Sequence, residues 1–282
     1  MSAHRRFAEI SPEVGVLDAA EFGTAMDESP DDALTLLADM AQATDESLRA
    51  AARALAGRVV LDLVRTGPPR GRGIGKLRAV PADRGGDLDL DLSMEAIAEP
   101  RALGHAPSLT DLVARQWARP TLALCLLIDA SGSMGGARLA AAALTAAACT
   151  WRAPGDHAVL AFARETTVLR PMTSTAPPGD VIDAVLSLRG HGVTGLAGAL
   201  SAAAEQLERS HATRRVVVLV SDCDATDGRD PLPAALALDD LAILAPEEDT
   251  EHAEDLARRS GARWKPMRAA SDAPAALIEL IS

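Results

Sequence analysis

The hydrophobic pattern of the first 66 residues is helical. Ser29 and Pro30, followed by two acids, are typical of a helix start, and so is Thr44 followed by Asp45 and Glu46. Leucine and alanine recur at helical spacing after both starts. The pattern therefore predicts a helical hairpin over residues 30–65, within an N-terminal helical region of residues 1–66.

From residue 119 to residue 282, short apolar runs alternate with longer amphipathic segments. Residues 121–128 and 215–221 are continuous apolar runs, as expected for strands buried on both faces of a parallel sheet. Further strands are predicted at 157–163, 167–171, 241–244 and 263–267, and helices at 138–151, 180–188, 196–209, 250–260 and 273–281. This alternation predicts an α/β fold with a doubly wound, mostly parallel sheet flanked by helices.

Residues 67–118 are predicted to be a connector or extension with little core of its own. Their first part belongs to a stretch, residues 65–78, with five basic residues and no acid. This stretch is either a solvated connector or a docking surface for an acidic partner. Residues 87–92 alternate between Asp and Leu, which predicts a strand, although Asp is a poor strand former.

Composition and charge exclude several classes of protein. Hydrophobic residues make up 48% of the 282-residue chain but aromatic residues only 2%, so the core is expected to be aliphatic. The 28 basic and 40 acidic residues give a net charge of −12, which argues against nucleic-acid binding. The longest apolar runs are shorter than the ~20 residues of a membrane span, and we expect a cytoplasmic protein. Cys125, Cys149 and Cys223 are expected to be reduced and buried.

Oxygen-bearing side chains gather where predicted strands end. Asp129, Ser131 and Ser133 follow the first apolar strand, Thr194 lies in a glycine-rich loop, and Asp222 follows the strand at 215–221. Loops at the carboxyl ends of strands converge on one edge of such a sheet. Two carboxylates and three hydroxyls are hard donors that suit Mg²⁺, or Mn²⁺ or Ca²⁺. By themselves, these residue types are also common in turns and helix caps.

This D-x-S-x-S motif, with a distant Thr and a distant Asp, resembles the metal-ion-dependent adhesion site (MIDAS) of von Willebrand factor A (VWA) domains. The resemblance covers residues 121–282 and implies that Asp129, Ser131, Ser133, Thr194 and Asp222 are the metal ligands. The family usually has Gly after the last Asp, where this chain has Cys223. Asp224 is therefore a competing ligand.

Residues 86–95 and 111–120 extend the resemblance to the CoxE-like and magnesium-chelatase D-subunit branch of bacterial A domains. This branch implies an adaptor or co-chaperone for a MoxR-type AAA+ ATPase, not an enzyme, with a client protein that offers Asp or Glu to the metal. The alternative is a magnesium-chelatase-like D-type subunit of a metal-insertion enzyme. The stretch before the A domain is too short for the ATPase-like module of such a subunit. A secreted adhesin is disfavoured because we see no signal peptide.

Three enzymatic interpretations are weaker. Residues 71–76 resemble the end of a P-loop but lack its first Gly and its Ser or Thr. Ser133, Asp222 and His252 follow the residue order of α/β-hydrolases, but Ser131 stands where the nucleophile elbow needs Gly. Asp222 and Asp224 could form half of a two-metal phosphoryl-transfer site.

Overall fold

A computed structural model describes residues 7–12, 16–66, 76–118, 121–132, 135–190 and 192–282. The chain forms two compact units. The first combines residues 1–70 with residues 122–282, and the second consists of residues 71–121.

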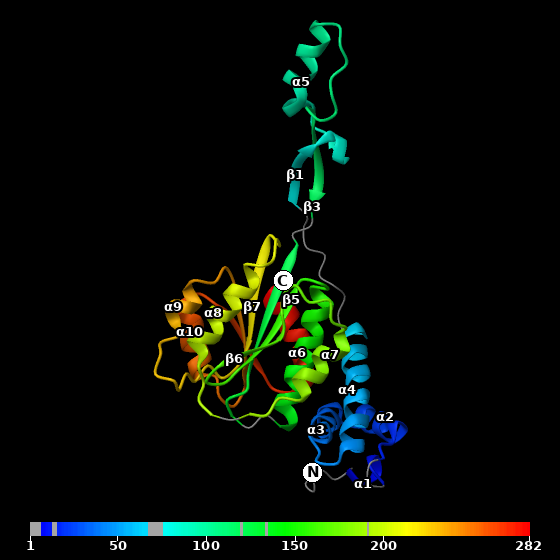
Figure 1. The fold of residues 1–282 in the computed structure, drawn as a ribbon, viewed down its shortest axis with the longest axis vertical. Helices are drawn as coiled ribbons and strands as arrows, with labels where there is room; N and C mark the ends of the chain where they lie inside the picture. The colour runs from blue at the N-terminus through cyan, green and yellow to red at the C-terminus, as the bar shows by residue number, and fades with distance from the viewer. Residues whose placement is uncertain (1–6, 13–15, 67–75, 119–120, 133–134, 191) are drawn as a thin grey trace. The chain divides into compact units, whose positions relative to one another are not determined.

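The first unit is built on a sheet that has six strands in the described part of the chain (Figure 1). Its strand order is β6-β5-β4-β7-β8-β9, and all pairs are parallel except β5 with β6. The bounds are β4 (Leu122–Asp129), β5 (His157–Phe162), β6 (Thr166–Arg170), β7 (Arg214–Val220), β8 (Leu241–Pro246) and β9 (Arg263–Met267). The predicted doubly wound, mostly parallel sheet is confirmed.

Helices cover both faces of this sheet, because its central strands are apolar on both sides. The helices are α6 (Gly136–Arg152), α7 (Pro178–Leu186), α8 (Leu196–Leu207), α9 (Leu232–Leu236), α10 (Glu251–Ser260) and α11 (Ala273–Ile281). Alternate residues of β4 belong to two different cores. Leu124 and Leu126 pack with α6, α7 and α11, whereas Cys125 and Leu127 pack with α8 and α10.

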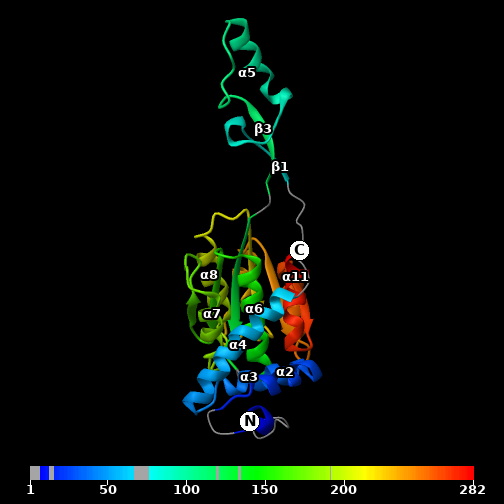
Figure 2. The ribbon, with the colours of Figure 1, turned by 90° about the vertical axis from the view of Figure 1, so that its right-hand side faces the viewer.

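In the described part of the N-terminal region, four helices add a further layer on the α6 side of the sheet. They are α1 (Phe7–Ile10), α2 (Ala19–Glu28), α3 (Pro30–Met40) and α4 (Glu46–Thr66). Figure 2 shows α4 crossing in front of α6, and both α3 and α4 contact α6. Leu34, Leu37 and Met40 of α3 are buried in the core that α6 shares, and Asp45 caps α4 by accepting a hydrogen bond from Leu48 N at 2.8 Å. The predicted helical hairpin is confirmed.

The described residues of the second unit form a small antiparallel sheet of order β1-β3-β2 and one long helix. Its elements are β1 (Lys76–Pro81), the 3₁₀ helix η1 (Ala82–Arg84), β2 (Asp87–Leu88), α5 (Leu90–Ala102) and β3 (Val113–Ala118). The predicted strand over residues 87–92 is wrong beyond Leu88. The Asp89 carboxylate accepts a hydrogen bond from Leu92 N at 3.1 Å, so it caps a helix that begins at Leu90.

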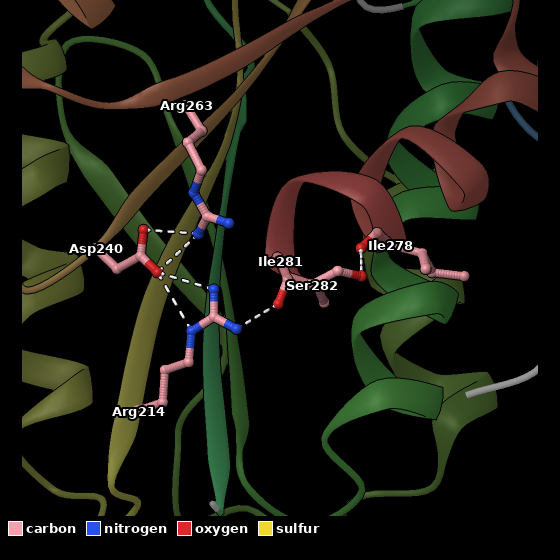
Figure 3. A network of polar contacts seen from close by, with 6 residues as sticks. All are labelled: Arg214, Asp240, Arg263, Ile278, Ile281 and Ser282. Carbon is pink, nitrogen blue, oxygen red and sulfur yellow. Dashed lines mark hydrogen bonds and ion pairs between the residues drawn. The ribbon is translucent and has the colours of Figure 1, made fainter. Parts of the chain in front are cut away.

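Charged groups tie together the amino ends of β7, β8 and β9 in the first unit (Figure 3). The Asp240 carboxylate lies 3.1 Å from Arg214 Nη2 and 2.7 Å from Arg263 Nη2, and Arg214 also donates to the carbonyl of Ile281. This network lies at the edge of the sheet opposite the predicted ligands, so its role is to hold α11 and the strands together.

The three cysteines are buried and free, as predicted. Burial raises the pKa of the Cys149 thiol to about 12. No helix in the described ranges is long and apolar enough to cross a membrane.

Candidate metal centre

The first site loop follows β4 directly and is organised by Asp129. One carboxylate oxygen of Asp129 accepts a hydrogen bond from Ser131 N at 2.9 Å, which closes a tight turn. Ala130 N donates to the carbonyl of Phe162 on the neighbouring strand at 2.7 Å. These bonds fix the start of the loop at the carboxyl edge of the sheet, as the sequence predicts.

The second oxygen of Asp129 is held by a residue that sequence reasoning missed. The Ser221 hydroxyl donates to Asp129 Oδ2 at 2.6 Å and accepts a hydrogen bond from Cys223 N at 2.9 Å. Ser221 is buried at the end of the apolar run that forms β7. A hydroxyl directly before a predicted ligand at a strand end is the signal that would have found it.

The glycine-rich loop brings Thr194 to the same place. Its hydroxyl donates to the Ser131 hydroxyl at 2.8 Å, although the two residues are 63 positions apart. Thr226, which sequence reasoning also missed, anchors this loop through two hydrogen bonds. Thr194 N donates to the Thr226 hydroxyl at 2.9 Å, and Thr226 N donates to the Thr194 carbonyl at 3.2 Å.

Asp222 and Asp129 line one small cavity, of about 80 Å³, together with Ser131 and Arg138. Partial burial and then the negative charge of Asp129 raise the pKa of the Asp222 carboxyl above its ordinary value. Both effects disfavour the ionised form of Asp222, and a cation bound between the two carboxylates would favour it.

Arg138 is the unexpected member of this cavity. It lies in the first turn of α6, and its positive charge favours the ionised form of Asp222. A Cβ atom placed on Gly132 would lie 3.4 Å from Arg138 Nη1, so the guanidinium lies against the first site loop. Arg138 therefore supplies part of the positive charge that the two carboxylates require.

The third loop departs from the usual family sequence at Cys223. Its φ of 66° is in the left-handed region, where the usual Gly has no steric cost and another residue costs about 1–2 kcal/mol. Asp224 N donates to Asp222 Oδ1 at 3.1 Å, while the Asp224 carboxylate lies 3.8 Å from His252 Nε2. Asp222 lines the cavity, and Asp224 and His252 do not.

Four of the five predicted ligands thus meet at one edge of the sheet, whereas Ser133 lies outside the described residues. The basic stretch of residues 65–78 also lies largely outside them. Among the described residues, no group of three His, Cys, Asp or Glu side chains could hold a metal ion, so any metal would need the hydroxyls as well. Two carboxylates with adjacent hydroxyls fit a hard divalent cation. The ligand assignment stays a prediction.

Comparison with known proteins agrees with this architecture. The family model described as "VWA domain containing CoxE-like protein" matches residues 47–273. The chain belongs to this family of CoxE-like VWA proteins. Such domains are protein-interaction modules in general. No curated protein matches the chain.

Solved structures with a similar fold share little sequence with the chain. An aerotolerance-related membrane protein from Bacteroides fragilis is 17% identical, with 57% of this chain and 98% of that chain covered and a TM-score of 0.45. A von Willebrand factor type A protein from Catenulispora acidiphila is 16% identical, with 59% and 43% covered and a TM-score of 0.47. BatB from Bacteroides thetaiotaomicron is 15% identical, with 57% and 96% covered and a TM-score of 0.44.

Proposed function

We propose that this chain is a cytoplasmic, metal-dependent protein-binding module that works as an adaptor or co-chaperone with a MoxR-type AAA+ ATPase. The observation that carries the proposal is the meeting of Asp129 and Asp222 in one small cavity beside the hydroxyls of Ser131 and Thr194. Membership of the CoxE-like family supports a protein-interaction role. In this proposal the chain is not itself an enzyme.

The site residues would hold Mg²⁺, or Mn²⁺ or Ca²⁺, with Ser133 as a further ligand. The bound cation would supply a Lewis-acidic position for one carboxylate oxygen of a client protein. Asp129 and Asp222 together carry two negative charges, so they neutralise a divalent cation, while the hydroxyl donors add no charge. The positive charge of Arg138 at the cavity would favour an incoming Asp or Glu.

The fixed hydrogen bonds of Asp129 would orient the site. Ser131 N donates a hydrogen bond to one oxygen of the Asp129 carboxylate, and the Ser221 hydroxyl donates to the other. The orientation of the carboxylate is therefore fixed before a cation binds. The Thr194–Ser131 bond keeps the first two loops in contact. Client binding would then depend on both the cation and the relative position of these loops.

Calorimetric titration with MgCl₂ and MnCl₂ tests the proposal. Asp129→Asn keeps the shape of the side chain but removes its charge, and we expect at least a tenfold loss of affinity for either ion. Asp239→Asn is the matched control, because Asp239 pairs with Arg215 near the amino ends of the strands. Equal metal affinity in wild type and Asp129→Asn would refute the site.

Client capture tests the carboxylate bridge. Thr194→Ala removes one oxygen donor without changing charge, so it should release a client that co-purifies with the chain and the ATPase, as EDTA should. Client capture that changes with neither EDTA nor Thr194→Ala would make the metal structural only.

Enzyme assays test the expectation that the chain is not a catalyst. Purified protein should show no esterase, phosphatase or ATPase activity above that of a Ser133→Ala, Asp222→Ala double variant.

A further inference from the structure

Helix α5 in the second unit exposes large apolar side chains together with charged ones, whereas its buried residue is polar. Ser93 is its one fully buried residue among those described, and its hydroxyl accepts a hydrogen bond from Val113 N at 2.9 Å and lies 3.1 Å from the Val113 carbonyl. The capping residue Asp89 pairs with Arg115 of β3. Polar contacts therefore attach α5 to its sheet.

Three large apolar side chains of α5 are exposed. Leu90 and Met94 are each 61% exposed, and Leu92 is 56% exposed. Leu90 and Met94 are four residues apart, so they lie one above the other on the same side of the helix. A helix in a small domain normally turns such a pair toward its own core. We call Leu90 and Met94 the α5 apolar surface.

Acidic side chains accompany this surface. Asp91 and Glu95 are exposed, and each follows a member of the Leu90–Met94 pair by one position. Residues 87–103 contain five acids and one arginine, a net charge of −4. A second copy of this helix would bring like charges together, and an anionic membrane would repel them. The partner that complements this surface has an apolar groove with Lys or Arg beside it.

We propose that the α5 apolar surface, with Asp91 and Glu95, is the docking site for the AAA+ ATPase, by insertion of this helix into a basic-edged apolar groove. This inference rests on the proposed function, whose metal centre would select a carboxylate of the client. The metal centre would bind an acidic segment of the client, whereas the acidic residues of α5 would repel such a segment. The metal centre therefore selects an acidic partner, and α5 selects a basic one. One chain then engages ATPase and client through separate units.

Binding of the purified MoxR-type ATPase, measured by biolayer interferometry on the full chain, tests the inference. Leu90→Gln with Met94→Gln keeps helix propensity and removes the apolar pair. We expect at least a tenfold loss of ATPase affinity and an unchanged melting temperature, because both side chains are exposed. Leu236→Gln is the matched control, since Leu236 is 58% exposed in the first unit.

A second variant tests the contribution of the acidic side chains Asp91 and Glu95. Asp91→Asn with Glu95→Gln should weaken ATPase binding and reduce its dependence on salt concentration, because favourable charge pairs are screened by salt. Asp239→Asn in the first unit should leave the ATPase affinity and its salt dependence unchanged.

Several outcomes would overturn the inference. ATPase affinity that is equal in wild type and Leu90→Gln/Met94→Gln would overturn it and leave the proposed function intact. A melting temperature lowered by that variant would show that α5 packs on its own chain. Dimerisation of wild type that this variant abolishes would make a second copy the occupant. Absence of ATPase binding by wild type would refute both the partnership and the docking site, whereas loss of Mg²⁺ binding in Asp129→Asn bears on the metal centre alone.

Discussion

Asp39 in the N-terminal helix α3 accepts a hydrogen bond from the backbone N–H of Gly136, at 2.8 Å, across 97 positions of sequence. Gly136 begins α6, which follows the first site loop. Nearby, Gln42 Nε2 donates to the carbonyl of Leu188 at 2.6 Å, just before the glycine-rich loop. The end of α3 and the turn after it thus contact the segments that lead to or from two of the predicted ligand groups.

Removing the Asp39 carboxylate should loosen the start of α6. We expect Asp39→Ala to lower the free energy of unfolding by about 1–2 kcal/mol, because Gly136 N loses its acceptor and the helix N-terminus loses a negative charge. The Mg²⁺ affinity of Asp39→Ala should also be lower than that of wild type. Chemical denaturation and calorimetry measure the two effects, and Asp27→Ala, at an exposed acid near the end of α2, is the control. Unchanged Mg²⁺ affinity in a destabilised Asp39→Ala would show that α3 does not support the site.

Arg138 should oppose cation binding. Its charge lies at the cavity that Asp129 and Asp222 line, and like charges repel. Arg138→Gln should therefore tighten Mg²⁺ binding several-fold, as measured by calorimetry at low ionic strength. Arg258→Gln, an exposed substitution on α10, should change nothing. Weaker Mg²⁺ binding in Arg138→Gln would mean that Arg138 shapes the site more than it repels the cation.

Gly195 is required by close approach of backbone. A Cβ atom at this position would lie 2.7 Å from the carbonyl oxygen of Arg164 and 3.0 Å from that of Ala163. Gly195→Ala must therefore shift the loop that carries Thr194, at a cost of about 1–3 kcal/mol in unfolding free energy, and should weaken Mg²⁺ binding. At Gly179 the same change meets no atom within 4 Å, so Gly179→Ala is the control. Equal stability of the two variants would contradict this packing.

His157 should make stability depend on pH. Burial and then the charge of Arg170 lower the pKa of His157 to about 4, and its ring lies 3.0 Å from the Thr150 hydroxyl and 2.9 Å from the Ala153 carbonyl. The unfolded chain binds a proton near the ordinary value of 6.5. The native state does not, so the stability that neutral His157 contributes is present above pH 6.5 and is lost as the pH falls toward 4.

Between pH 7 and pH 5, this effect should lower the free energy of unfolding of wild type by about 2 kcal/mol more than that of His157→Asn, which cannot titrate. Urea titrations of both proteins at the two pH values measure the difference. The contribution of carboxyl groups cancels in the comparison. Parallel pH dependence in the two proteins would place the His157 pKa near its ordinary value.

Local sequence signals predicted most of the first unit. The apolar runs at 121–128 and 215–221 became β4 and β7, since a strand buried on both faces accommodates such a run. Asp45 capped α4 as its residue type predicts. The signal failed at residues 87–92. Alternation favoured a strand there, but Asp89 caps a helix by accepting a hydrogen bond from one of the free N–H groups of its first turn.

The sequence by itself determined which side chains stand at strand ends, and so that Asp129, Ser131, Thr194 and Asp222 would share one edge of a parallel sheet. Only the tertiary structure decided what each of them contacts. Ser221 holds Asp129 from 92 positions away, and Asp39 reaches Gly136 from a separate helical layer. The physical reason is that periodicity records which face of an element is apolar or which end is polar, whereas the partner that covers it depends on packing between distant segments.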